Sequence, residues 1–114
     1  MVLLRLYLLL ESQNSMIIID IIQPKEDVAI EISKYLIEKR YAIQAHIDTN
    51  AILNSTEGIK TIRLFFITKA LLFDLIYKDI NEKFYSEELL IYATPVSHIS
   101  HDFGEMLRMK LKAV

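Results

Sequence analysis

The sequence predicts an α+β domain in which a four-stranded antiparallel sheet carries two helices on one face. One observation is that β-branched residues recur in continuous or alternating runs, as they do in strands. These runs are residues 16–22, 42–50, 61–67 and 86–96. The other observation is that two amphipathic stripes with helical spacing separate those runs, at residues 24–40 and 68–84. The predicted element order is therefore β-α-β-β-α-β.

The composition of the 114-residue chain limits its classes of function. Its 13 basic residues are outnumbered by 15 acidic ones, and no basic run exceeds two adjacent residues, so we expect no nucleic-acid partner. The chain has no cysteine, which excludes disulfides and thiolate metal sites and favours a cytoplasmic location. Because 53% of the residues are hydrophobic, slightly above the globular average, we expect another subunit to cover part of the apolar surface.

Residues 1–15 are predicted to be an N-terminal extension of a single domain that spans residues 16–114. Their apolar run, VLLRLYLLL, is too short to cross a bilayer, and no small-residue cleavage site follows it. We therefore expect an added structural element rather than a signal peptide, and no membrane partner. The first strand has a neighbour on each side, so the extension is expected at a sheet edge or on a neighbouring subunit.

The first half of the domain is predicted to begin with the strand MIIIDII at residues 16–22. Alternation places Ile17, Ile19 and Ile21 on the face that meets the helices. Pro24 is expected at the first helical position, where a missing N–H is harmless. The helix that follows carries an amphipathic stripe at spacings of three and four residues, formed by Val28, Ala29, Ile32, Tyr35, Leu36 and Lys39.

The middle of the chain is predicted to form a hairpin and a second helix. Residues 42–50 alternate between two faces, a turn at residues 54–58 follows, and residues 61–67 return as a strand. Thr68 is expected to cap the next helix. The buried stripe of that helix is Phe73, Ile76, Tyr77, Ile80 and Phe84.

The last predicted strand, SEELLIYATPV at residues 86–96, is apolar on both faces. We expect it to end at Pro95, because proline cannot donate a hydrogen bond to a strand ladder. Asp102 and Glu105 have capping-box spacing, which predicts a short C-terminal helix running to Lys112. Two strand-helix units with a trailing helix form the ferredoxin-like arrangement, with sheet order 4-1-3-2. One face of that sheet is left open.

Four segments of the chain together resemble one known family, the CutA divalent-cation-tolerance proteins, which are trimeric relatives of the PII signalling proteins. The resemblance runs from Met16 to Leu111, and the spacing from Thr68 to Pro95 matches the family without a gap. The segments are MIIIDII at 16–22 followed by Pro24, LIEKRYA at 36–42, LFFIT at 64–68 and YATPV at 92–96.

Other positions depart from the family pattern. FYSEELLI at residues 84–91 stands where the family has H-P-Y-x-x-P-E-I, and Gln44 stands near the family's cysteine. The chain therefore looks like a divergent member. The resemblance implies a non-enzymatic homotrimer that takes part in the response to divalent metal ions, with a cation such as copper or zinc as its possible ligand.

The open sheet face is predicted to carry a polar network around Asp20, an acid within a run of isoleucines. Arg63 on the third strand and Tyr92 on the fourth are expected to flank it. A buried carboxylate needs a charge partner or hydrogen bonds. Two interpretations stay open: an ion pair within a trimer interface, or a ligand site.

Two histidine-containing motifs are weak candidates for a metal site. His46-x-Asp48 places an imidazole and a carboxylate on one strand face, and three copies around a trimer axis would be needed to complete the ligand set. His98-x-x-His101 lies in the connection before the last helix. Asp102 follows it, but is expected to cap that helix instead.

Three classes of function are compatible with the sequence. The first is the CutA-like homotrimer, and the second is a PII-like small-molecule sensor, although the loop at residues 53–60 is short for that role. The third is a dimeric ferredoxin-like enzyme with His46, Asp48 and Tyr92 around a cavity on the open face. Ser100-His101-Asp102 are adjacent in the chain and cannot form a catalytic relay among themselves. The first class is the one that we expect.

Overall fold

The computed structural model describes residues 15–50 and 61–114. Their element order confirms the predicted β-α-β-β-α-β arrangement with a C-terminal helix. The elements are β1 (Met16–Gln23), α2 (Glu26–Glu38), β2 (His46–Asp48), β3 (Ile62–Lys69), a 3-10 turn (Ala70–Leu72), α3 (Phe73–Phe84), β4 (Leu90–Val96) and α4 (His101–Lys110). The order in the sheet is β2-β3-β1-β4, which is the predicted 4-1-3-2 order counted from the other edge.

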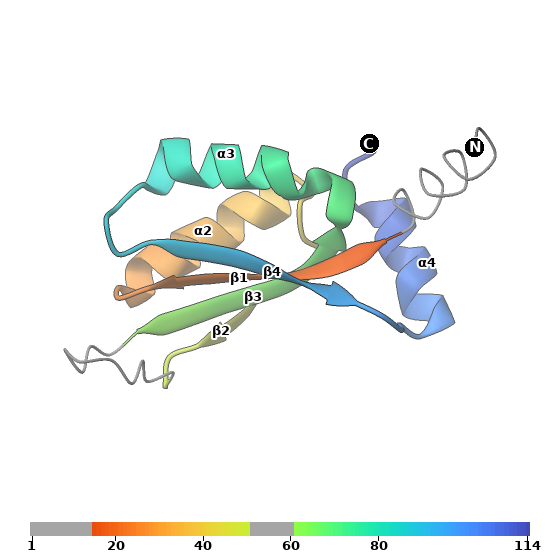
Figure 1. Cartoon of the computed structure of the whole chain (residues 1–114), viewed down its shortest axis with the longest axis horizontal. Coiled ribbons are helices and arrows are strands. Elements are labelled where there is room, and N and C mark those ends of the chain that lie inside the picture. Colours follow the sequence, from red (N-terminus) through yellow and green to blue (C-terminus); the bar gives the residue numbers. More distant parts are fainter. Residues whose placement is uncertain (1–14, 51–60) are drawn as a thin grey trace, which may run out of the picture.

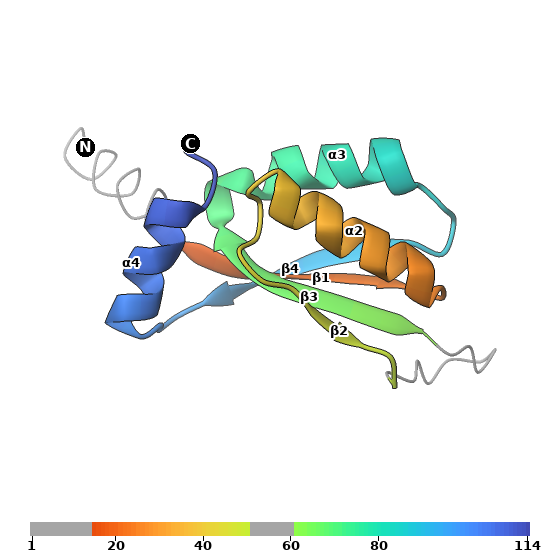
Figure 2. The same ribbon diagram turned by 180° about the vertical axis from the view of Figure 1, so that it is seen from behind.

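Two layers and one end helix make up the domain. In both Figure 1 and Figure 2, α2 and α3 lie side by side on one face of the sheet, and α4 lies at one end of it. The β1–α2 turn and the α3–β4 connection meet at the opposite end (Figure 1). Within the part of the chain that the structure describes, no helix covers the central part of the other face, which we call the open face.

The register of the central strand brings distant residues onto one line. β1 pairs antiparallel with both β3 and β4. Asp20 lies opposite Phe65 on one side and opposite Tyr92 on the other. Arg63 lies opposite Ile22, so it reaches Asp20 along a diagonal. This pairing follows from the period of two in each strand, because a slip by one residue would turn every side chain to the wrong face.

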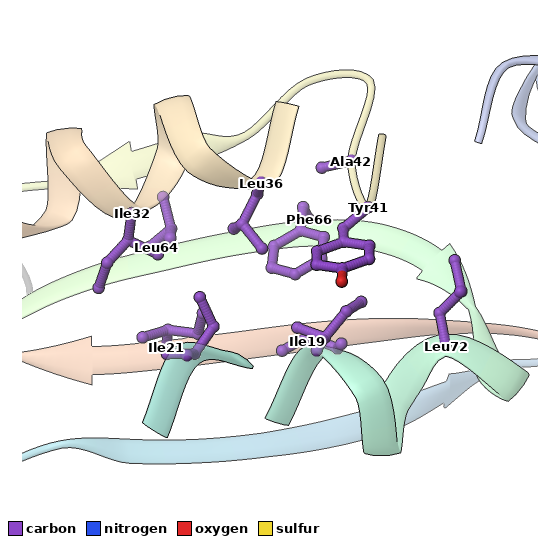
Figure 3. Packing of buried hydrophobic residues seen from close by; sticks show 11 residues of the cluster. Ile19, Ile21, Ile32, Leu36, Tyr41, Ala42, Leu64, Phe66 and Leu72 are labelled. Carbon is purple, nitrogen blue, oxygen red and sulfur yellow. The ribbon is translucent and has the colours of Figure 1, made fainter. Parts of the chain in front are cut away.

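The main core lies between the sheet and the two helices. Ile19 and Ile21 of β1 point toward Leu64 and Phe66 of β3 and toward α2 (Figure 3). From the helices, Ile32 and Leu36 of α2 and Ile76 and Ile80 of α3 are fully buried. Burial of such side chains stabilises the fold by about 1.5–3 kcal/mol each. The apolar stripes predicted for both helices therefore supply the core.

A second apolar cluster holds α4 against the end of the sheet. Met16, Leu107 and Leu111 are buried there, with Phe103 packed beside them. Backbone hydrogen bonds reinforce this contact, because the N–H of Lys112 donates to the carbonyl of Arg40 at 2.8 Å. The short C-terminal helix is therefore an integral part of the domain.

Arg40 ends α2 in an unusual conformation. Its φ of 61° lies in the left-handed region, which glycine usually occupies at this position after a helix. The N–H of Arg40 donates to Ile37 and the N–H of Tyr41 donates to Leu36, the two hydrogen bonds of a Schellman motif. The guanidinium then donates to the carbonyls of Lys110 (Nε, 3.0 Å) and Leu111 (Nη2, 3.4 Å). The side chain thus links the end of α2 to the end of α4.

Several local predictions differ from the structure. The first helix begins at Glu26 rather than at Pro24, because the side chain of Gln23 hydrogen-bonds both backbone groups of Lys25 and closes a turn there. Thr68 does not cap α3; it lies within β3, and its hydroxyl donates to the carbonyl of Tyr41 at 2.6 Å.

Further differences concern one residue of α3, the start of α4 and the extents of β2 and β4. Tyr77 was expected in the buried stripe but is 48% exposed, while the other four residues of that stripe, Phe73, Ile76, Ile80 and Phe84, pack in or against the main core. Ser100, not Asp102, is the N-cap of α4, and it makes no side-chain capping bond. Glu105 pairs with Arg108 instead.

Only residues 46–48 of the predicted 42–50 strand pair with β3. β4 continues one residue past Pro95, as an edge strand allows.

Some predictions concern residues outside the described part of the chain. These are the placement of most of the 1–15 extension, the turn at residues 54–58 and most of the loop at residues 53–60.

Candidate functional site on the open sheet face

A buried carboxylate lies at the centre of the open face. Asp20 comes from the middle of β1, and its side chain is 4% exposed. The Nε of Arg63 donates to its Oδ1 at 2.5 Å. The Arg63 side chain is 37% exposed, so one partner of this ion pair is buried while the other reaches the surface. Such a pair satisfies the carboxylate, which would otherwise be costly to bury.

Phe65 organises the polar side chains around that pair. The guanidinium of Arg63 lies 4.2 Å from the centroid of the Phe65 ring. On β2, the imidazole of His46 stacks on Phe65 with centroids 4.9 Å apart and planes at 16°. Sequence reasoning placed His46 and Arg63 on this face but missed Phe65. The signal was present, because Phe65 is two residues from Arg63 and a strand returns to the same face every second residue.

β4 adds large apolar surface to the same face. Leu90 is 50% exposed and Tyr92 is 42% exposed. Tyr92 lies opposite Asp20 in the ladder, as predicted, but its hydroxyl makes no hydrogen bond to Asp20 among the described contacts. Half-buried Ile18 and Ile67 continue this surface toward α4. The open face thus combines a buried charge pair with exposed apolar side chains.

The predicted metal motif lies at the edge of this face. His46 and Asp48 are both exposed residues of β2, and Oδ1 of Asp48 accepts a hydrogen bond from the N–H of Asn50 at 2.9 Å. Within residues 15–50 and 61–114, no three His, Asp or Glu side chains come together as a metal-binding group. The described residues of one copy therefore offer an incomplete ligand set, since structural and catalytic zinc sites use at least three protein ligands.

The second histidine motif lies elsewhere, beside α4. His101 begins that helix and is exposed. His98 is also exposed, and its Nδ1 lies 3.2 Å from the hydroxyl of Ser97. The structure does not bring these histidines together with His46 and Asp48 into one described cluster.

A further polar cluster, on the helix side, was missed by sequence reasoning. The hydroxyls of Tyr41 and Tyr35 both donate to Oδ2 of Asp79, the bond from Tyr35 measuring 3.5 Å. Burial, followed by the hydrogen bond to Asp79, raises the pKa of Tyr41 well above its usual range. Burial and the charge of Asp79 also raise the pKa of Tyr35. The cluster ties the end of α2 to α3, and it lies away from the open face.

No helix in the described part of the chain is both long and apolar enough to cross a bilayer.

Comparison with known proteins gives a result in structure but not in sequence. No protein-family model matches the sequence, and no curated protein matches it. Among solved structures, CutA1 from Oryza sativa superimposes with a TM-score of 0.80 at 14% identity, covering 90% of this chain and 99% of that one.

Two more solved structures show the same likeness. The divalent cation tolerance protein CutA1 from Thermus thermophilus has a TM-score of 0.74 at 20% identity, covering 85% of this chain and 99% of its own. The periplasmic divalent cation tolerance protein CutA from Archaeoglobus fulgidus has a TM-score of 0.75 at 18% identity, with the same coverage. Nearly the whole of each relative is matched, so the chain has the ferredoxin-like fold of the CutA1 divalent-cation-tolerance proteins.

Proposed function

We propose that this chain is a divergent CutA-like protein, a non-enzymatic homotrimer that takes part in the response to divalent metal ions. The fold likeness supports the family, since structures named for divalent cation tolerance match over 85–90% of this chain. The cytoplasmic location expected from the absence of cysteine stays a prediction, because one relative is described as periplasmic.

The open face is the observation that supports the proposed trimer. Leu90 and Tyr92 are exposed there beside the buried carboxylate of Asp20. An apolar face of this kind on a soluble domain indicates an interaction surface. A closed cyclic trimer covers one such face per subunit without leaving an open-ended contact. The Asp20–Arg63 pair would then lie inside the assembly.

Metal binding, in this proposal, belongs to the assembled protein. Among the described residues, a single copy offers His46 and Asp48 at the edge of the open face, and we expect a second subunit to contribute further ligands. Imidazole and carboxylate ligands suit zinc and copper(II). The chain would provide no thiolate ligand, since it contains no cysteine.

Two measurements test this proposal. Light scattering coupled to size exclusion, across a dilution series of the full chain, should give three times the mass of 13.3 kDa. A monomer would contradict the assembly, and a dimer would favour the enzyme-like arrangement with two facing sheets. Calorimetric titration with zinc and copper should then show saturable binding by the trimer, and a trimer that binds neither metal would contradict the metal-ion role.

A further inference from the structure

A cleft lies at the end of the molecule opposite α4. One wall is the junction of β1 and α2, with Gln23, Pro24 and Lys25, and the other is the α3–β4 connection at residues 84–89. These two segments adjoin at the same end of the sheet in Figures 1 and 2. The cleft has a volume of about 490 Å³, within the range of about 300–1,000 Å³ that small-molecule sites occupy. Neither wall contains a residue of the polar network on the open face.

Local hydrogen bonds preform both walls. The Gln23 side chain is nearly buried and bonds to Lys25 twice, with its Nε2 donating to the carbonyl at 2.6 Å and its Oε1 accepting from the N–H at 2.7 Å. In the other wall, the N–H of Leu89 donates to the carbonyl of Ser86 at 3.2 Å. Ordering the cleft on binding would therefore cost little free energy, which favours binding of a ligand.

The floor of the cleft is apolar. Val28 of α2, Phe84 at the end of α3 and Leu89 before β4 all line it. The same three side chains are half-buried and pack against the main core. They are therefore held in place from below while their upper surfaces face the cleft. An apolar group of a ligand would gain stability by covering this surface.

Charged side chains of both signs also line the cleft. Their positions indicate which class of ligand it would bind. Lys25 stands on the α2 wall, whereas Glu87 and Glu88 stand on the opposite one. No described residue forms an ion pair with any of these three side chains. Lys83, the other cation at the cleft, lies over the Tyr35 ring at 4.3 Å and so is already engaged.

These charges favour a ligand that carries both signs. A plain anion would meet Glu87 and Glu88, and a plain cation would meet Lys25. A zwitterion with an apolar group satisfies both walls and the floor together.

We propose that this cleft binds a free α-amino acid with an apolar side chain. The carboxylate lies at Lys25, the ammonium group lies at Glu87 and Glu88, and the side chain covers Val28, Phe84 and Leu89. This site is separate from the proposed trimer and metal functions. A CutA-like trimer that binds no amino acid would contradict this inference alone.

The test is calorimetric titration of the full chain with L-leucine and three analogues at millimolar concentration. Isocaproate lacks the ammonium group, isoamylamine lacks the carboxylate, and glycine lacks the apolar side chain. L-leucine should bind saturably. Isocaproate and isoamylamine, which each lose one exposed charged contact, should bind up to about fivefold more weakly, and glycine, which loses the apolar contact, should bind about tenfold more weakly or worse. No saturable heat with leucine, or equal binding of the analogues, would overturn the inference.

Variants locate the binding in this cleft. Lys25→Ala and the double variant Glu87→Gln/Glu88→Gln should weaken leucine binding up to about fivefold, as expected for exposed charge pairs. Val28→Glu should abolish binding by placing a charge on the floor. Lys34→Ala, an exposed lysine of α2 outside this cleft, is the matched control and should bind as wild type. Because Lys25 and both glutamates are exposed, their variants should fold, and light scattering checks their assembly. Unchanged leucine binding in them would place the ligand elsewhere and refute the site.

Discussion

Asp20 and Arg63 form an ion pair in which the carboxylate is buried and the guanidinium is partly exposed, with side-chain exposures of 4% and 37%. The two residues lie on neighbouring strands, 43 positions apart in the chain. This asymmetry means that the two partners are not equivalent when one is removed. Within one subunit, removing Arg63 leaves a buried charge without its partner, whereas removing Asp20 leaves a charge that can still reach solvent.

We therefore predict that Arg63→Met destabilises the chain more than Asp20→Asn does. Loss of one partner of a fully buried pair costs about 3–5 kcal/mol, and partial exposure should bring Arg63→Met somewhat below that range. Asp20→Asn, which retains an acceptor, should cost about 1 kcal/mol. Urea unfolding measures both, with His98→Ala as a surface control. Equal costs for the two variants would contradict this asymmetry and would mean that assembly buries Arg63 as well.

Assembly should depend on the apolar part of the open face. Leu90→Lys places a charge where the proposed trimer excludes water, so it should shift the light-scattering mass toward that of a monomer. Ile30→Lys on α2 is the matched control, because Ile30 is 39% exposed and Leu90 is 50% exposed. The control should assemble as wild type. If both variants stay trimeric, the open face is not the interface.

Stability should fall at alkaline pH because of Tyr41 and Tyr35. The native state holds their protons above the ordinary tyrosine pKa of about 10, while the unfolded chain releases them. Unfolding free energy should therefore be insensitive to these groups below pH 10. Above it, the loss should approach about 1.4 kcal/mol per pH unit for Tyr41, with a smaller contribution from Tyr35.

Tyr41→Phe should make that alkaline slope shallower and, by losing the bond to Asp79, cost about 1 kcal/mol at neutral pH. Tyr77→Phe, at a half-exposed tyrosine of α3, should keep the wild-type slope. Denaturant unfolding followed from pH 8 to 11 distinguishes the two. A slope unchanged by Tyr41→Phe would show that other groups cause the alkaline loss.

Substitutions at Arg40 should separate a backbone effect from a side-chain effect. Arg40→Ala loses the bonds to Lys110 and Leu111 but keeps the left-handed backbone, while Arg40→Gly loses the same bonds and relieves the strain. Left-handed geometry costs a non-glycine residue about 1–2 kcal/mol, so the glycine variant should be the more stable by about that amount. Hydrogen exchange should show faster opening of α4 in both. Unchanged protection of α4 would mean that apolar packing alone holds that helix.

Metal binding by the assembled protein should depend on His46. His46→Ala should weaken zinc or copper binding at least tenfold, and binding to the wild type should weaken on acidification, because a protonated imidazole cannot ligate a metal. His98→Ala and His101→Ala serve as controls in the same titration. Undiminished affinity in His46→Ala, with loss in either control, would move the site to the start of α4.

Local pattern was enough to predict much of the architecture. The period of two in MIIIDII correctly placed Ile19 and Ile21 on the helix face and Asp20 on the other, because a strand turns its side chains to alternate faces whatever surrounds it. The order of strand and helix signals then left few ways to pair the strands. Capping and end positions were less predictable, since Thr68 and Asp102 have several possible hydrogen-bond partners and only packing selects one.

Contacts between distant segments were decided by tertiary structure alone. Tyr41 meets Asp79 across 38 positions, and Arg40 meets Leu111 across 71. Neither residue type nor spacing in the chain distinguishes these pairs from many others, because a hydrogen bond forms only where the packed layers bring a donor to an acceptor. The sequence by itself thus determined which face each strand residue occupies. The tertiary structure decided which partner each polar side chain found, and it alone formed the cleft between the β1–α2 junction and the α3–β4 connection.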